Sequence, residues 1–362
     1  MINIIKGRIL NEKENIKNSF FVIITIIMIL VLFLANDISE IGQILKKIKP
    51  IWLLTALGFL IIYFFINALS LMIVIKDENL KIRDSFLVSS IEYFYNGITP
   101  SNTGAQPMQV VEYKRLGVST SHATGALLIN SVINQIAIVF LCLLSLIYYK
   151  ELSKGVESIK VLIIIGLSIN ILVLVLYVSI GISNKIKNGF VKIVRFICTR
   201  KIFKSKLTSV SDKFEGFCVE AQVSFKEAFK HPLRLIVALL FKIFALIIFY
   251  SLPYFVLMSL DIHLGPNTIF LVIAMTTFSI AMTCFVPTPG ASGGIEFAFK
   301  SLFINLAGVT SSVAVSGMLL WRLLTYYILM IISLICYFLL EFFFVKRSKK
   351  ENLSNNEIID EN

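Results

Sequence analysis

Residues 51–75 read IWLLTALGFLIIYFFINALSLMIVI and contain no charged side chain. A transmembrane α-helix needs about 20 predominantly apolar residues, so this stretch is long enough to cross a bilayer. Similar apolar stretches recur along the chain. We predict about six full spans, at 19–35, 51–75, 122–148, 159–181, 233–258 and 312–345.

The composition supports a membrane protein over a soluble one. Of the 362 residues, 57% are hydrophobic and 15% are charged, whereas about 25% of a soluble domain is charged. The mean hydropathy is +0.85. A water-soluble globule cannot cover so much apolar surface. We therefore predict an all-α polytopic membrane protein and exclude a soluble enzyme of ordinary type.

The cysteines and histidines form no recognisable site. The five cysteines are odd in number and contain no CxxC pair, and the three histidines are scattered. These patterns predict neither a disulfide framework nor a metal site. No cofactor site and no catalytic residue can be recognised either.

The basic residues orient the chain. We place the N-terminus in the cytoplasm and let two interrupted apolar regions, 85–113 and 267–308, each enter and leave on one side. The cytoplasmic segments then hold 25 of the 34 Lys and Arg residues, as the positive-inside rule requires. These segments are 1–18, 76–84, 114–121, 183–234 and 346–362. The net charge of +12 therefore indicates topology rather than a nucleic-acid partner.

This topology divides the chain into three parts. Residues 1–18 form a cytoplasmic segment, 19–345 a single transmembrane domain, and 346–362 a polar tail expected to be disordered. We interpret the first span as an uncleaved anchor, because no small-residue cleavage site follows it. The loop 183–234 begins with an amphipathic pattern from Ile186 to Ile197, which indicates either an interfacial helix or an ordinary basic loop.

The two interrupted regions contain related strings. Residues 99–104 and 288–293 both fit T-P-x-x-[ST]-G, and under the predicted topology they enter from opposite sides. This arrangement is typical of inverted repeats, in which two broken helices meet near the middle of the membrane and line a binding site. The alternative is a pair of kinks that only ease helix packing.

Ionisable and polar residues near these breaks are the candidate substrate-binding residues, because such groups are costly inside a membrane. Simpler readings are a local ion pair between Glu296 and Lys300, and a Lys242 side chain that extends to the interface. Cations suit a phosphate, and carboxylates suit an amine. The full set comprises Glu92, Asn96, Thr99, Pro100, Gly104, Gln106, Gln109, Lys242, Thr288, Pro289, Gly290, Gly293, Gly294, Glu296, Lys300 and Arg322.

With these motifs in view, residues 15–345 resemble the lysylphosphatidylglycerol synthase transmembrane family. This is the flippase-like membrane half of the bacterial multiple peptide resistance factor. The strings NGITP (96–100) with GAQPMQ (104–109) resemble the family pattern T-P-x-x-x-G-G-Q-P-x-Q, and PTPG (287–290) with GGIE (293–296) resemble P-x-P-G-x-x-G-x-x-E. Ala105 stands where the family pattern has its second glycine.

The resemblance implies a lipid translocase of the bacterial plasma membrane, with both termini cytoplasmic. Its partners would be anionic or aminoacylated phospholipids such as lysyl-phosphatidylglycerol. It would contribute to resistance against cationic antimicrobial peptides and could work with a separate synthase. Two alternatives remain open: a phosphatidylglycerol lysyltransferase or its membrane subunit, and a non-transporting accessory protein. No extramembrane segment is long enough for the family's lysyl-transferring domain, so we expect this chain to lack it.

Overall fold

The computed structural model describes residues 48–77, 80–99, 104–152, 157–199, 225–283, 293–306 and 309–360, with a few isolated residues outside these ranges. This part of the chain is helical and contains no strand. Five of its helices are long and apolar enough to cross a membrane. They are Pro50–Ile75, Thr120–Leu152, Lys160–Ser179, Pro232–Ser259 and Ser311–Lys346. Each matches a predicted span, and the predicted span 19–35 lies outside the described residues.

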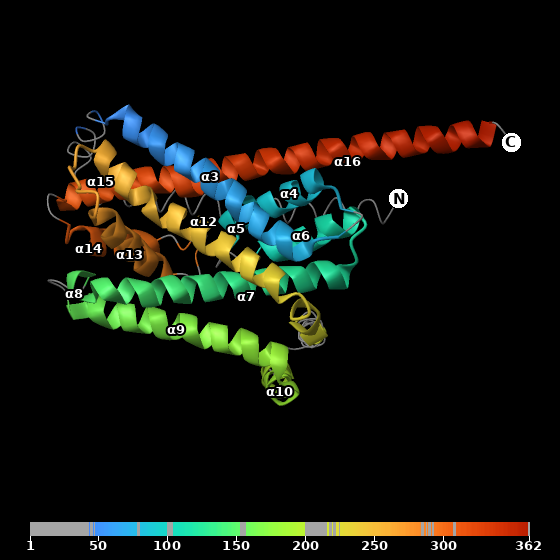
Figure 1. The fold of residues 1–362 in the computed structure, drawn as a ribbon, viewed down its shortest axis with the longest axis horizontal. Coiled ribbons are helices and arrows are strands. Elements are labelled where there is room, and N and C mark those ends of the chain that lie inside the picture. The colour runs from blue at the N-terminus through green and yellow to red at the C-terminus, as the bar shows by residue number, and fades with distance from the viewer. Residues whose placement is uncertain are drawn as a thin grey trace.

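Helices α3 (Pro50–Ile75) and α12 (Pro232–Ser259) form the most extensive helix pair (Figure 1). They run antiparallel, and the N–H of Lys49 donates to the carbonyl of Ser259 at 2.8 Å where α3 begins and α12 ends. Aromatic rings fill the contact between them, with 4.5 Å between the ring centroids of Tyr63 and Phe249. This pair is the central wall against which the shorter helices pack.

Helix α7 (Thr120–Ser145) packs on both α3 and α12, and α9 (Glu157–Ile182) runs alongside α7 (Figure 1). Short segments η1 (Leu146–Tyr148) and α8 (Tyr149–Leu152) extend the end of α7. After α9, helix α10 (Asn184–Thr199) turns away from the α9 direction (Figure 1). Helix α10 includes Ile186 to Ile197, the segment whose sequence pattern indicated an amphipathic helix.

The first interrupted region consists of three short helices, α4 (Ile82–Ser90), α5 (Glu92–Gly97) and α6 (Ala105–Arg115). α6 packs back on both α4 and α5, so the chain reverses direction within the region. The second interrupted region contains α13 (Thr268–Ala281) and α14 (Gly294–Phe303), which also pack on each other. Because each helix is shorter than a full span needs, both regions end helices inside the apolar part of the fold.

The last predicted span is divided in three. Helix α15 (Ser311–Arg322) continues through a π-helical segment, η3 (Leu323–Ile328), into α16 (Leu329–Asp360). α16 extends well beyond the end of the predicted span (Figure 1). Residues 346–360, whose composition predicts disorder, are therefore helical in the structure. Extending an existing helix requires no new nucleation, so even a polar segment rich in Lys and Asn can continue it.

Candidate functional site

A cavity of about 220 Å³ lies between the two interrupted regions. Residues of α5 form one side and residues around the start of α14 form another. The end of α15 and the π-helical segment close it, and α12 and α13 contribute one apolar side chain each. The lining residues are Tyr93, Asn96, Gly97, Phe249, Ile280, Thr283, Ala291, Ile295, Trp321, Arg322, Thr325 and Tyr326. Regions almost 200 residues apart in the sequence thus contribute to one cavity.

Among the described lining residues, the charged one is Arg322, which forms an ion pair with Glu296 beside the cavity wall. The Arg322 Nε donates to Glu296 Oε1 at 2.8 Å, and the two side chains are 11% and 5% exposed. Glu296 Oε2 also accepts the N–H of Gly293 at 2.5 Å, which caps the start of α14. Gly293 has a φ of 89°, a conformation that favours glycine. Glu296 is thus paired with Arg322, and not with Lys300 one turn along its own helix.

The π-helical segment joins this ion pair to the first interrupted region. π-helical turns are rare and occur frequently at functional sites. The guanidinium of Arg322 lies 4.9 Å from the ring centroid of Tyr326, within the range of a cation–π contact. The Tyr326 hydroxyl donates to the carbonyl of Gly97 at 2.7 Å. A continuous set of contacts therefore runs from Glu296 to the end of α5.

Side chains of the first break satisfy its backbone groups. The Thr99 hydroxyl donates to the Tyr95 carbonyl at 2.7 Å and accepts the N–H of Gly104 at 2.9 Å. The Asn96 Oδ1 accepts the N–H of Ala105 at 3.2 Å. An added Cβ at Gly104 would lie 2.5 Å from Thr99 Cγ2, so the tight position in this turn is Gly104, where the family pattern and this chain agree.

A second buried charged group lies beside the cavity. Lys242 Nζ donates to Asn67 Oδ1 at 2.6 Å, and Asn67 Nδ2 donates to Glu92 Oε1 at 2.5 Å and to the Tyr93 hydroxyl at 2.6 Å. Lys242 is only 3% exposed, so it does not extend to the interface. Sequence reasoning missed Asn67, although an amide in the middle of the uncharged run 51–75 was a readable signal. Tyr93 carries this network to the cavity wall.

The remaining predicted residues lie around the cavity rather than on it. Gln109 is buried and donates to the carbonyls of Val88 and Ser89, which holds α6 against α4. Gln106 donates to Ser131 on α7. Thr288, Gly294 and Lys300 do not line the cavity. Pro100, Pro289 and Gly290 lie outside the described residues.

Within the described ranges, no group of three or more His, Cys, Asp or Glu side chains is placed to hold a metal ion. The described part of the cavity wall contains the guanidinium of Arg322, with Glu296 as its partner beside the wall, two tyrosines and the indole of Trp321. The Trp321 Nε1 is buried and has no hydrogen-bond partner in the part of the chain that the structure describes. These are groups that bind a charged polar ligand rather than catalytic metal or nucleophile groups.

The family described as lysylphosphatidylglycerol synthase TM region matches residues 20–333, which include both breaks and the Arg322–Glu296 pair. The chain belongs to this family. A UPF0104 membrane protein of Pyrococcus horikoshii is similar, with 25% identity over 324 residues that cover 86% of this chain and 94% of that protein. Family membership and the apolar helices together establish a multi-pass membrane protein.

Proposed function

We propose that this protein translocates a phospholipid between membrane leaflets, with the headgroup passing through the cavity between the two interrupted regions. These regions would enter the membrane from opposite sides as an inverted repeat, with both chain termini in the cytoplasm of a bacterial cell. The observation that carries the proposal is the shared cavity, lined by Arg322, together with the buried ion pair that Arg322 forms with Glu296 next to it. Buried charges in a membrane are costly and mark ion and substrate pathways.

The size of the cavity favours a headgroup as its occupant. Its volume of about 220 Å³ is below the about 300–1,000 Å³ of pockets that enclose drug-sized ligands. A phosphate with a short polar substituent would fit, whereas acyl chains would have to stay in the surrounding lipid. Helices on the outside of the bundle supply an apolar surface for such chains, for example at Phe270 and Phe297.

The charges of the cavity favour a headgroup with both signs of charge. A phosphate would replace Glu296 as the partner of Arg322, whose planar guanidinium binds phosphate oxygens well. An ammonium group would replace Arg322 as the partner of Glu296. Both buried charges then stay compensated while the headgroup is bound, which avoids the large cost of an unpaired buried charge. An aminoacylated lipid such as lysyl-phosphatidylglycerol meets this requirement.

On this proposal the protein would contribute to resistance against cationic antimicrobial peptides, because a cationic lipid in the outer leaflet repels them. We also propose a separately encoded synthase as the partner that supplies the lipid. Incubation of the purified protein alone with lysyl-tRNA and phosphatidylglycerol is then expected to form no lysyl lipid. Formation of that lipid by the protein alone would identify it as a lysyltransferase instead.

The test of translocation uses vesicles that contain lysyl-phosphatidylglycerol and the purified protein. An impermeant amine-reactive reagent measures how fast the lipid amine appears in the outer leaflet. We expect the wild-type protein to raise this rate above that of protein-free vesicles, and the double variant E296Q/R322Q to lower it at least about tenfold.

The matched control is K49Q/D261N, which removes the exposed ion pair between Lys49 and Asp261, neither of which lines the cavity. It should translocate within about twofold of wild type. Both variants must elute as single species with wild-type helicity. Undiminished translocation by E296Q/R322Q would show that the cavity is not the pathway, and no effect of the wild-type protein would reject translocation itself.

A further inference from the structure

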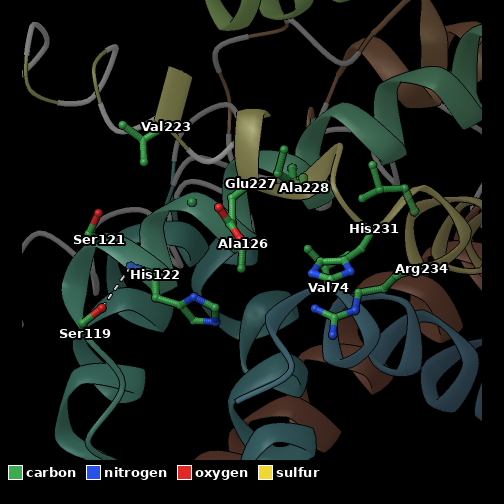
Figure 2. Close-up of a pocket in the computed structure, with 13 residues that line it drawn as sticks. Val74, Ser119, Ser121, His122, Ala126, Val223, Glu227, Ala228, His231 and Arg234 are labelled. Carbon is green, nitrogen blue, oxygen red and sulfur yellow. Dashed lines mark hydrogen bonds between the residues drawn. The ribbon is translucent and has the colours of Figure 1, made fainter. Parts of the chain in front are cut away.

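A second cavity, of about 290 Å³, lies where α7 and α12 begin and α3 ends (Figure 2). The helical residues 225–228 cover one side of it. It is separate in the fold from the cavity between the interrupted regions and shares no lining residue with it. By the charge distribution of the loops, this end of the bundle faces the cytoplasm.

Three basic side chains line this cavity. His231 is the residue directly before α12 and Arg234 lies in its first turn, and Figure 2 shows their side chains next to each other. His122 lies on the first turn of α7, where its N–H is capped by the Ser119 hydroxyl at 3.2 Å and its ring contacts the Ile75 carbonyl at 3.2 Å. These contacts fix the position of His122 on the cavity wall.

The guanidinium of Arg234 is the group in this cavity that is available to a ligand. Arg234 is half-buried, and its side chain makes no hydrogen bond or ion pair with any other described residue. The carboxylate in the lining, Glu227, is already paired with Lys230 at 2.6 Å. That hydrogen bond lowers the pKa of Glu227 below its usual value. Among the lining residues that the structure describes, Arg234 is therefore a cation without a carboxylate partner.

The rest of the lining is apolar and continues onto the outer surface of the bundle. Val74, Ala126 and Ile129 form part of the cavity wall. Next to Arg234, the side chain of Leu233 is 72% exposed and faces outward, as a lipid-contacting residue does. A ligand with one negative charge and an attached apolar tail matches both features, whereas a doubly charged free phosphate matches only the cation.

We propose that this cavity binds the singly charged phosphodiester headgroup of an anionic phospholipid from the cytoplasmic leaflet, with Arg234 as its principal ligand. The lipid tails lie against the apolar wall and the neighbouring outward-facing side chains. This binding is independent of the proposed translocation at the other cavity. It requires only that an anionic lipid reach the cytoplasmic end of α12.

The test is calorimetric titration of the purified protein in detergent with three short-chain probes. Dihexanoyl-phosphatidylglycerol has both the phosphodiester and the tails, dihexanoylglycerol has the tails alone, and glycerol phosphate has the phosphate alone. We expect the complete lipid to bind at least about tenfold more tightly than either fragment. Equal affinity for glycerol phosphate would indicate a site for free phosphate, and equal affinity for dihexanoylglycerol would indicate apolar binding only. Either result overturns the proposal.

Arg234→Gln should weaken binding of dihexanoyl-phosphatidylglycerol about tenfold, and Arg234→Lys should weaken it less because it keeps the charge. Lys226→Gln is the matched control, since Lys226 is exposed on the adjacent segment and does not line the cavity. An equal loss in Lys226→Gln would reveal unspecific attraction and reject the site. Should Arg234→Gln fail to fold, the comparison of Arg234→Lys with Lys226→Gln decides in the same way.

The same titrations in the E296Q/R322Q background separate the two cavities. If the tenfold effect of Arg234→Gln persists there, the lipid binds at the cytoplasmic cavity regardless of whether translocation occurs. If the effect disappears in that background, the lipid binds between the interrupted regions and the proposal is wrong.

Discussion

In the first break, Gly104 is the position where one added methyl group should lower the stability of the fold most. A Cβ at this residue would lie 2.5 Å from Thr99 Cγ2, 2.7 Å from Thr99 Oγ1 and 2.8 Å from the Tyr95 carbonyl oxygen. Carbon atoms in contact normally lie about 3.5–4.0 Å apart, so the neighbours would have to move by roughly 1 Å. The φ of Gly104 is −80°, so the constraint is space and not backbone conformation.

Thr99 and the Tyr95 carbonyl cannot move away from an added methyl group without weakening their hydrogen bonds. Thr99 is held by its hydrogen bonds to Tyr95 and Gly104, and each is worth about 0.5–1.5 kcal/mol. Overpacking adds about 1–3 kcal/mol. We therefore expect Gly104→Ala to lower the free energy of unfolding by about 2–4 kcal/mol. Because Asn96 and Gly97 of the same break line the cavity, we also expect slower lipid translocation.

The assay is denaturant unfolding in detergent micelles, followed by far-ultraviolet circular dichroism. Gly58→Ala is the control, because a Cβ at Gly58 in α3 meets no atom within 4 Å. That change should stabilise the protein by about 0.5–1 kcal/mol through helix propensity. Thr99→Ala combined with Gly104→Ala should cost less than the sum of the two single changes, since it removes two of the three clashes. Equal unfolding free energies for Gly104→Ala and Gly58→Ala would refute the steric reasoning.

Two further changes test the polar contacts around the cavity by the same unfolding measurement. Ser333→Ala should cost about 1–3 kcal/mol, because the buried Ser333 hydroxyl accepts the Phe94 N–H across the joint between α4 and α5; Ser316→Ala removes only a bond within its own helix and should cost less. Lys242→Gln should cost about 1.5–3 kcal/mol, and adding Glu92→Gln should recover part of this loss because the buried carboxylate is then neutral. If adding Glu92→Gln recovers none of the stability lost in Lys242→Gln, the charges of Lys242 and Glu92 do not interact.

The spans were predictable from the sequence, because length and lack of charge are enough to identify a membrane-spanning helix. In the described residues, each predicted span corresponds to an apolar helix within a few residues at either end. The position of the breaks also followed from local signals, since Pro and Gly are clustered there with small polar residues, whereas a single residue such as Pro253 in α12 or Gly58 in α3 leaves its helix continuous. Residues next to both breaks line one cavity, while the inverted-repeat topology that the motif suggested stays a prediction.

The pairing of the rare charges was less predictable. Spacing along a helix pointed to Glu296 with Lys300, but the partner of Glu296 is Arg322, on the next helix. Such a partner depends on how the turn between α14 and α15 sets the two helices, and no local pattern encodes this. Asn67 was missed for a related reason: a single amide in an apolar run gains meaning only when Lys242 and Glu92 are seen beside it.

The π-helical segment after Arg322 has a consequence for how the cavity could change shape. A π-helical turn contains one residue more than an α-helical turn, and one residue corresponds to about 100° of rotation. The segment therefore sets α15, which packs on α12 and α14, out of phase with α16, which packs on α4 and α5. If the extra residue moved along the helix by one turn, Arg322 would rotate away from Glu296 while both helices kept their neighbours. The register of a single backbone turn would then decide which way the cation faces.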